Sequence, residues 1–310
     1  MGKVTMGKLD SAEQMSALTD LETEQQHPDF AIILPTYCEA ESIRNLIEDI
    51  KVLTNAYIIV VDDSSPDGTS EIVKKLMDMH ENIALIERPA KLGLGSAIMD
   101  GFRFSLQINP PPKYIVTMDA DFSNAPRDIL KLVSAAKQGW DLVIGSRYCK
   151  GSRIIRSRST VPIFRRVLNI AVSFVFGLDV SDSTSGFRCY SSRFVENILP
   201  RLRSETYEIE IETLKQAKEK RFHTVEMPIR FEDRKMGKQK LSFSRFVKLM
   251  SLLLLGRRDH VIEDNKIKVG IERMNKITTE WKSIVDDQLT KRKLQDALKK
   301  KRNTYSNGAR

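Results

Sequence analysis

Cysteine is scarce in this chain, and the three that it contains lie far apart, at Cys38, Cys149 and Cys189. An odd number of widely spaced cysteines is not typical of a disulfide framework or of a zinc site. We therefore expect a protein of a reducing compartment.

Long apolar runs are missing as well. The densest apolar stretch near a terminus is "LMSLLLL", residues 249–255, whereas a membrane-spanning helix needs roughly 20 apolar residues. Residues 1–29 are polar and acidic, unlike a secretory signal peptide, and they show no apolar periodicity. We expect no transmembrane span and no signal peptide, and we expect residues 1–29 to form a flexible tail.

Charge of one sign is in excess, because the formal net charge is +9. Residues 1–29 are net acidic, so the excess lies in the middle of the chain and in residues 257–310. A basic surface favours anionic partners such as nucleotide phosphates, lipid phosphates or nucleic acid. The basic tail lacks interleaved aromatic residues and any nucleic-acid-binding signature, so we do not expect nucleic acid as a partner.

Apolar strands alternate with amphipathic helices through the first half of the chain. This alternation is typical of an α/β protein with a parallel, doubly wound sheet. The pattern predicts strands at 30–35, 57–63, 83–89, 114–121 and 140–148, and helices at 39–53, 69–80, 95–107 and 126–139.

The pattern changes after residue 150. It predicts apolar helices at 162–178 and 243–256, a polar turn at 181–190, a helix at 207–220, a strand at 223–231, and basic loops at 152–160 and 232–242. Residues 261–298 again show helical spacing of apolar side chains. We predict a flexible tail at 1–29, a catalytic domain at 30–256 and a basic helical extension at 257–310.

Polar residues gather where the predicted strands end. They are residues 35–39, 62–63, 91–95, 119–121 and Arg147. In open parallel sheets, ligands bind beyond the carboxyl ends of the strands. We therefore expect these segments to converge on one binding site.

The stretch "MDADFSNAP" places Asp119 and Asp121 one residue apart at the predicted end of the fourth strand. Side chains at i and i+2 of a strand point the same way, so both carboxylates are expected to face one ligand. Two such carboxylates suit a hard divalent cation completed by phosphate oxygens and water. The alternative is a solvated turn that caps the following helix.

Seven motifs occur in the order found in glycosyltransferase family 2. They are "ILPTYCEAESI", "VVDDSSPDGTSEIV", "KLGLGSAIMDGF", "MDADFSNAP", "IGSRY", "STSGFRCY" and "DRKMGKQKLS". Over residues 30–250 the chain resembles this family, and most of all its dolichyl-phosphate mannosyltransferase branch. The resemblance implies a nucleotide-sugar-binding, GT-A type, Rossmann-like fold with a mostly parallel sheet. It also implies a nucleotide-sugar donor, a Mg or Mn cation, a polyprenyl-phosphate acceptor and inversion at the anomeric carbon.

The resemblance assigns residues to the donor and its cation. Alternative roles stay open: Tyr37 as a half-buried core residue, Asp62 and Asp63 as turn residues, and Gly93 and Gly95 as a tight strand-to-helix turn. The glycines follow the third strand rather than the first, which argues against an NAD fingerprint. The residues that the resemblance assigns to the donor and its cation are Pro35, Tyr37, Glu39, Asp62, Asp63, Lys91, Gly93, Asp119, Ala120, Asp121, Arg234 and Lys240.

In the family, the metal-binding triplet, residues 119–121 in this chain, is followed two residues later by a residue that also reaches the metal and is often glutamine. This chain has Ser123 there. A hydroxyl is a shorter and weaker ligand, so water is an alternative in that position. We expect Asp119, Asp121 and Ser123 to form the metal site.

The acceptor side needs cations rather than a base. A phosphate monoester is largely dianionic at neutral pH, so no proton has to be removed from it. The family's phosphate contacts match Arg147, Arg165, Arg234 and Lys240, and Asn169 stands where serine is common. Arg165 and Asn169 are spaced i, i+4 and could present one helix face to one phosphate.

The predicted mechanism is mostly positioning and electrostatics. We expect Asp121, Arg147 and Arg165 to be catalytic, and Arg147, Arg165 and Asn169 to bind the acceptor phosphate. For Arg166 a role and a solvated helix position are equally favoured.

The apolar helices at 167–178 and 246–256 are expected to lie in a membrane interface, with burial in the core as the alternative. The extension at 257–310 could bind anionic lipid, form a coiled-coil dimer, pack on the catalytic domain or remain a solvated tail. Peripheral attachment to the cytoplasmic face of a membrane, with a partner membrane subunit or a homodimer, is the corresponding expectation.

On the strength of the resemblance, we expect transfer of mannose from GDP-mannose to dolichyl or another polyprenyl phosphate. One alternative is a polyprenyl-phosphate transferase that uses a UDP-sugar, either glucose or N-acetylglucosamine. The other is a non-catalytic nucleotide-binding or scaffolding subunit, which predicts broken motifs.

Overall fold

The structure is a computed structural model that describes residues 28–155, 166, 169–170, 172–174 and 176–232. The predicted tail (except residues 28 and 29), the predicted domain boundary at 256/257 and the predicted helical extension lie outside the described residues.

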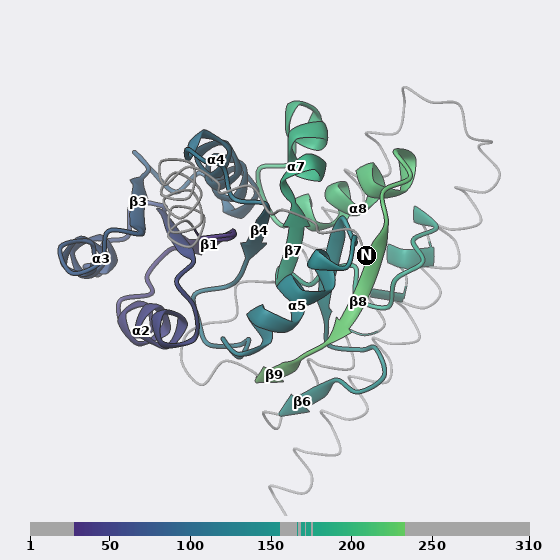
Figure 1. The fold of residues 1–310 in the computed structure, drawn as a ribbon, viewed down its shortest axis with the longest axis horizontal. Helices are drawn as coiled ribbons and strands as arrows, with labels where there is room; N and C mark the ends of the chain where they lie inside the picture. The colour runs from purple at the N-terminus through teal and green to yellow at the C-terminus, as the bar shows by residue number, and fades with distance from the viewer. Residues whose placement is uncertain (1–27, 156–165, 167–168, 171, 175, 233–310) are drawn as a thin grey trace, which may run out of the picture. The chain divides into compact units, whose positions relative to one another are not determined.

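A seven-stranded sheet forms the centre of the described part, with the strand order β3-β2-β1-β4-β7-β5-β8 (Figure 1). Neighbouring strands are parallel except where β7 lies antiparallel between β4 and β5. The strand order reverses between β1 and β4, which is where open α/β sheets form their binding crevice. The strands are β1 (Phe30–Thr36), β2 (Tyr57–Asp62), β3 (Ile83–Glu87), β4 (Tyr114–Thr117), β5 (Leu142–Ser146), β7 (Arg188–Ser191) and β8 (Thr224–Pro228).

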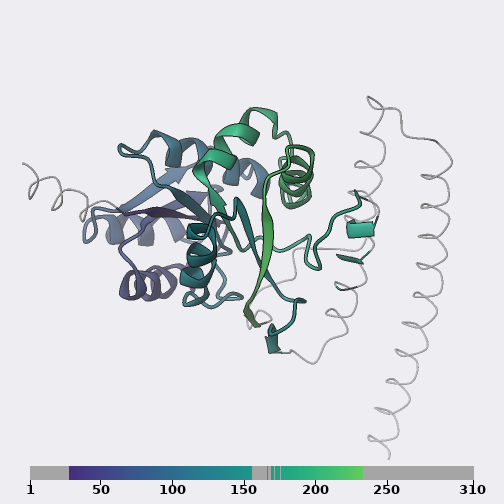
Figure 2. The same ribbon diagram turned by 45° about the vertical axis from the view of Figure 1, so that its right-hand side comes forward.

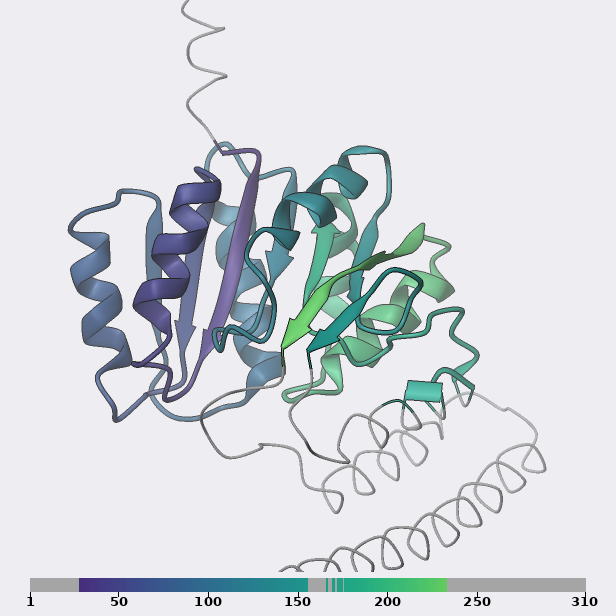
Figure 3. The same cartoon turned by 90° about the horizontal axis from the view of Figure 1, so that it is seen from below.

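Helices cover both faces of this sheet. In Figure 1 and, from below, in Figure 3, α2 (Ile43–Leu53), α3 (Thr69–Met77) and α5 (Asp128–Lys137) lie on one face. The other face carries α4 (Leu94–Gln107), α7 (Ser192–Ile198) and α8 (Ile209–Glu219), and the short 3₁₀ helix η1 (Leu199–Arg201) follows α7. With both faces covered, the central strands are apolar almost throughout, as β1 shows: its residues 31–34 have no exposed surface.

The apolar spacing of the helix predicted at 39–53 is confirmed. Ile43, Leu46, Ile47 and Ile50 of α2 are all fully buried against the sheet. Burying a side chain of this size contributes roughly 1.5–3 kcal/mol, before the loss of conformational entropy is counted. This face therefore fixes α2, and with it the loop after β1, against the sheet.

A second, two-stranded sheet pairs β6 (Arg153–Ile155) with β9 (Arg230–Glu232). Figure 2 shows β8 running on into β9, so the small sheet extends from the ends of β5 and β8. Its backbone reaches the loop after β4, because the N–H of Glu232 donates to the carbonyl of Ser123 over 2.9 Å.

Three elements differ from the sequence-based expectation. The predicted strand at 114–121 ends at Thr117, and the predicted strand at 223–231 is divided into β8 and β9. The predicted polar turn at 181–190 runs into β7, which α7 then follows. The arginine in β7 suggests a surface segment, yet Arg188 is completely buried because carbonyl groups and a hydroxyl accept hydrogen bonds from its guanidinium.

Within the described part of the chain, no helix combines the length and the apolar character that crossing a bilayer requires. The helix predicted at 162–178 is described only in part. Ile170 and Phe174 on it are 61% and 71% exposed, whereas Val172 is buried. This helix therefore has an exposed apolar face in addition to its buried face.

Candidate active site

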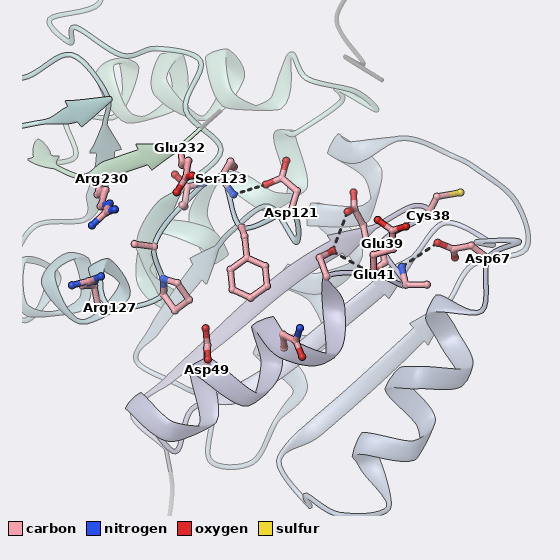
Figure 4. Close-up of a pocket in the computed structure, with 17 residues that line it drawn as sticks. Cys38, Glu39, Glu41, Asp49, Asp67, Asp121, Ser123, Arg127, Arg230 and Glu232 are labelled. Carbon is pink, nitrogen blue, oxygen red and sulfur yellow. Dashed lines mark hydrogen bonds between the residues drawn. The ribbon is translucent and has the colours of Figure 1, made fainter. Parts of the chain in front are cut away.

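A cavity of about 970 Å³ opens at the carboxyl edge of the sheet. Residues 38–42 after β1, the first turns of α2, and residues 121–127 between β4 and α5 form most of its wall (Figure 4). It therefore lies beside the β1/β4 reversal where a ligand is expected. Its polar lining includes Glu39, Asp67, Asp121, Ser123, Arg127 and Arg230.

Asp119 and Asp121 lie in the turn before α5 rather than on the strand, because β4 ends at Thr117. The alternation rule for strands therefore does not apply to them. Asp121 lines the cavity, and its Oδ1 accepts the N–H of Ser123 over 3.0 Å. Asp119 lies beside the start of β7, with both carboxylate oxygens 4.0 Å from where a Cβ on Gly186 would stand.

The oxygen atoms near this turn fit a hard divalent cation. Asp121 and Ser123 line one cavity, and Mg²⁺ is usually held by one or two carboxylates together with substrate phosphates and water. Among the described residues, no three acidic, histidine or cysteine side chains are grouped as a complete metal cage. A cation here would therefore rely on Asp119, Asp121 and the donor's own phosphates, and Ser123 remains a predicted ligand.

Asp62 is buried at the end of β2 and accepts four hydrogen bonds. Its Oδ1 accepts from the hydroxyls of Thr36 (2.7 Å) and Ser65 (2.6 Å), and its Oδ2 from the hydroxyl of Ser70 (2.9 Å) and the N–H of Ser65 (2.8 Å). These contacts hold the turn between β2 and α3. These hydrogen bonds correspond to the alternative in which Asp62 is a turn residue. Nucleotide binding by Asp62 stays a prediction.

Asp63 is buried next to it and joins β2 to the segment after β3. One oxygen receives Nη1 of Arg88 at 2.5 Å, and the other receives the N–H of Gly93 at 2.9 Å. Arg88 is buried as well, and its Nη2 donates to the hydroxyl of Ser96 at 2.6 Å. Asp63 thus holds the backbone at Gly93 against the carboxyl end of β2.

The residues after β1 and β3 approach each other. The ammonium group of Lys91 lies 3.5 Å from the centroid of the Tyr37 ring, and Tyr37 is half-buried. Glu39 is buried and lines the cavity; its carboxylate accepts the hydroxyl of Ser42 at 3.3 Å. Pro35 ends the apolar run of β1 at the same edge. Four residues that the sequence analysis assigned to the donor are therefore brought to one edge of the sheet.

Gly93 and Gly95 pack against the backbone of residues 204–206. A Cβ on Gly95 would stand 2.2 Å from the carbonyl oxygen of Ser204, and one on Gly93 would stand 2.5 Å from that of Glu205. Gly93 also has a φ of +105°, which side-chain-bearing residues rarely adopt. Both glycines therefore serve the close approach of α4 to this segment, and a phosphate contact stays a prediction for Gly93.

Arg147, directly after β5, forms a two-pronged ion pair with buried Asp182. Its Nε and Nη2 donate to Oδ2 and Oδ1 over 2.7 and 2.6 Å, and Nη2 also donates to Thr184 over 2.9 Å. Burial alone would lower the pKa of Arg147, but the charge of Asp182 and its hydrogen bonds raise that pKa above the ordinary value, and the charge of Asp119 adds to the rise. The guanidinium and the Asp119 carboxylate are thus electrostatic neighbours.

Asn169 shares this network. It is fully buried; its carbonyl oxygen accepts from Ser183 and from the N–H of Thr184, both over 3.1 Å, and its amide donates to the Thr184 hydroxyl over 3.0 Å. Asn169 and Arg147 thus meet at Thr184. Ala120 is buried between the two aspartates, and Arg166 is exposed. Arg165, Arg234 and Lys240 lie outside the described residues.

Sequence reasoning assigned no role to Arg88, Asp182, Thr184 or Glu210. Thr184 lies inside the motif "STSGFRCY" and Asp182 directly before it, so their position was a usable signal. For Glu210, the sequence contains no comparable signal of a role. Burial raises the pKa of Glu210 to about 8 although the charge of Arg188 opposes the rise, and Asp119 and Glu208 add to it.

Comparison with known proteins identifies the family. The model of glycosyl transferase family 2 matches residues 31–199. The chain is 32% identical over 222 residues to polyprenol monophosphomannose synthase of Mycolicibacterium smegmatis, an alignment that covers 71% of this chain and 83% of the relative. A protein of Methanocaldococcus jannaschii is 31% identical over 204 residues, which is 64% of this chain and 79% of that protein.

Solved structures share the fold. Glucosyl-3-phosphoglycerate synthase of Mycobacterium tuberculosis, in complex with Mn²⁺, UDP and glucosyl-3-phosphoglycerate, superposes with a TM-score of 0.53 at 16% sequence identity, over 81% of this chain and 85% of that one. The GT-A type, mostly parallel sheet flanked by helices is confirmed. The chain therefore belongs to glycosyl transferase family 2 and is an enzyme of the hexosyltransferase class.

Proposed function

We propose that this enzyme transfers mannose from GDP-mannose to dolichyl or another polyprenyl phosphate, with inversion at the anomeric carbon. The observation that carries the proposal is the likeness to polyprenol monophosphomannose synthase, which extends over 83% of that relative. The product is a mannosyl phosphodiester of the lipid.

The chemistry needs no general base. An oxygen of the acceptor phosphate dianion attacks the anomeric carbon, the bond from that carbon to the donor's β-phosphate oxygen breaks, and GDP leaves. A Mg or Mn ion bound by Asp119 and Asp121, with or without Ser123, would offset the charge that develops on the leaving diphosphate. Solved neighbours of this fold were crystallised with Mn²⁺ or Mg²⁺, which supports a divalent cation here.

The residues of this chain are proposed to position both substrates. The charge of Asp119 acts on Arg147, which supports a role for Arg147 in bringing the acceptor phosphate to the donor. Arg165 and Asn169 are proposed to assist on the acceptor side, Asn169 through Thr184, since its side chain is buried. Pro35, Tyr37, Glu39, Asp62, Asp63, Lys91, Gly93, Ala120, Arg234 and Lys240 are proposed for the donor.

The acceptor is a membrane lipid, so we propose peripheral attachment at the cytoplasmic face of a membrane. Ile170 and Phe174 support this, because both are largely exposed and lie one helical turn apart, near exposed Arg166. A partner membrane subunit or a homodimer is proposed as the remaining means of attachment.

A UDP-sugar donor is the second candidate. Solved neighbours contain UDP or UDP-glucose, and this observation favours it, although the sequence identity is only 16%. A non-catalytic scaffolding role, by contrast, predicts a damaged site, and the carboxylates Asp119 and Asp121 and the paired Arg147 are all present.

The test is a donor panel with the purified 310-residue chain. Radiolabelled GDP-mannose, UDP-glucose and UDP-N-acetylglucosamine are each supplied with polyprenyl phosphate in lipid vesicles, with Mg²⁺, with Mn²⁺, with chelator, and without acceptor lipid. We expect organic-soluble product only from GDP-mannose, and only with a metal and the lipid. Turnover of a UDP-sugar in place of GDP-mannose overturns the first choice.

Asp121→Asn provides the matched variant. We expect a fall in kcat of at least about 100-fold, because part of the charge that holds the cation is lost. Asp78→Asn, the same change at an exposed site at the carboxyl end of α3, is expected to leave the rate unchanged. Full activity of Asp121→Asn would overturn the role of Asp121 in holding the cation, whereas no turnover of any donor by wild type would favour the scaffolding alternative.

A further inference from the structure

One edge of the Arg147 guanidinium is held by protein groups. Nε and Nη2 both donate to the carboxylate of Asp182, and Nη2 donates to Thr184 as well. In the described part of the chain, Nη1 has no such acceptor in the hydrogen-bond network. A guanidinium held in this way keeps two N–H groups of Nη1 for another anion.

Two aromatic rings lie near the same guanidinium. The ring of Tyr148 lies 5.3 Å from its central carbon and the ring of Phe231, on β9, lies 5.4 Å from it. Arginine side chains stack on aromatic faces at such distances. The planar group is therefore fixed by a carboxylate on one edge and by two rings nearby.

Asp182 is itself tightly held. It is fully buried, and its Oδ2 also accepts the backbone N–H of Arg147 over 2.9 Å. Glu226 on β8 accepts the backbone N–H groups of Ser181 and Asp182, each over 2.9 Å, and so anchors this segment to the sheet. The carboxylate of Asp182 is thus held in one position relative to the carboxyl end of β5.

A contribution to stability alone does not account for this arrangement. The side chains of Arg147 and Asp182 are 11% and 0% exposed, and removing two charges from water offsets most of the attraction within a buried pair. What a two-pronged carboxylate contact does supply is a fixed direction for the guanidinium. The charge of Asp119 also acts on Arg147, so the direction of the guanidinium matters here.

We infer that Asp182 is a positioning residue: its carboxylate orients Arg147 so that Nη1 meets the anionic phosphate bound during transfer. The inference rests on the proposed function, in which Arg147 contacts the acceptor phosphate. Asp182 acts through Arg147 and touches no substrate itself. Glu226 supports it from β8 by holding the backbone of residues 181 and 182.

The test compares Asp182→Asn with Asp141→Asn. Asp141 is a second buried aspartate, paired with Arg193 over 2.7 Å and situated just before the other end of β5, so it matches the change without touching the site. For Asp182→Asn we expect kcat to fall by about 10- to 100-fold and the acceptor KM to rise, because a misplacement near 1 Å can cost that much. We expect the donor KM and all constants of Asp141→Asn to stay within about twofold of wild type.

A double-mutant cycle separates positioning from loss of folding. If Asp182 acts through Arg147, then Arg147→Ala and Arg147→Ala/Asp182→Asn have the same residual rate. Additive losses, or wild-type kinetics for Asp182→Asn, would overturn the inference. If Asp182→Asn does not fold, Thr184→Val removes one contact of the same guanidinium, and it is expected to raise the acceptor KM with the donor KM unchanged.

Binding measurements keep this inference distinct from the proposed function. Calorimetry with a short-chain isoprenyl phosphate and with GDP needs no turnover. We expect Asp182→Asn to weaken isoprenyl phosphate binding by at least about fivefold and to leave GDP binding unchanged. Failure of wild type to transfer any sugar would overturn the proposed function, whereas equal isoprenyl phosphate binding by wild type and Asp182→Asn would overturn the role of Asp182.

Discussion

The ammonium group of Lys91 lies 3.5 Å from the centroid of the Tyr37 ring. Tyr37 follows β1 and Lys91 follows β3, so the contact crosses the carboxyl end of β2, which lies between them. The face of the ring that Lys91 covers is closed to a stacking nucleobase while the contact lasts. Both residues are proposed for the donor, so this contact links the base region to the phosphate region.

Lys91→Met tests which part of this contact matters. We expect GDP affinity to fall about three- to tenfold. The variant loses a charge-assisted contact to the GDP phosphate in the bound state, and this contact is worth more than the roughly 0.5–1 kcal/mol of the exposed cation–π contact that it loses in the free state. We expect unfolding free energy to change by less than about 1 kcal/mol. Calorimetric titration with GDP measures the first, and Lys75→Met, at an exposed site on α3, is the control. Tighter GDP binding would instead show that Lys91 blocks the ring.

Gly95→Ala is expected to destabilise the fold. The new Cβ would meet the carbonyl oxygens of Ser204 and Thr206 at 2.2 and 2.6 Å, and backbone atoms cannot move aside as side chains do. The expected loss of unfolding free energy is about 3 kcal/mol or more. Chemical denaturation measures it.

Gly139→Ala is the matched comparison for that variant. Gly139 has a φ of +102° and open space around it, so only the backbone cost of about 1 kcal/mol is expected. If Gly95→Ala unfolds like wild type but loses GDP binding, then Gly95 is needed for the approach of the GDP phosphate and not for packing against residues 204–206.

Glu210 predicts a pH dependence of stability. Burial raises the pKa of Glu210 to about 8, from an ordinary value of 4.5, with Arg188 opposing the rise and Asp119 and Glu208 adding to it. Between these two values the folded chain holds a proton that the unfolded chain has released, so unfolding free energy falls as pH rises through that window. The loss is about 1.4 kcal/mol for each pKa unit separating the two states.

Glu210→Gln removes this ionisation and keeps the shape. We expect its unfolding free energy to lose less than that of wild type between about pH 5 and about pH 9, with the two proteins most alike at the acidic end. Thermal unfolding in the presence of chelator, so that no cation contributes, measures the difference. Glu219→Gln, an exposed change on the same helix, should follow wild type. Parallel curves for wild type and Glu210→Gln would contradict the prediction.

Asp62 and Asp63, at the carboxyl end of β2, show how far the sequence can be taken. Their place at a strand end followed from the apolar run before them, and the structure confirms it. Their partners did not follow, because Asp62 is held by Ser70 and Thr36, and Asp63 by Arg88, 25 residues away. Long-range hydrogen bonds leave no periodic trace in a sequence.

The sequence by itself determined the order of strands and helices up to residue 148, the apolar face of α2, and the family. Apolar periodicity and spaced motifs are local properties, and they survive in the linear order of residues. Only the tertiary structure decided that β7 enters the sheet between β4 and β5, and that Arg147 finds its carboxylate 35 residues away in Asp182. Strand insertion and a buried ion pair depend on which distant segments share the interior, and this is settled when the whole domain packs.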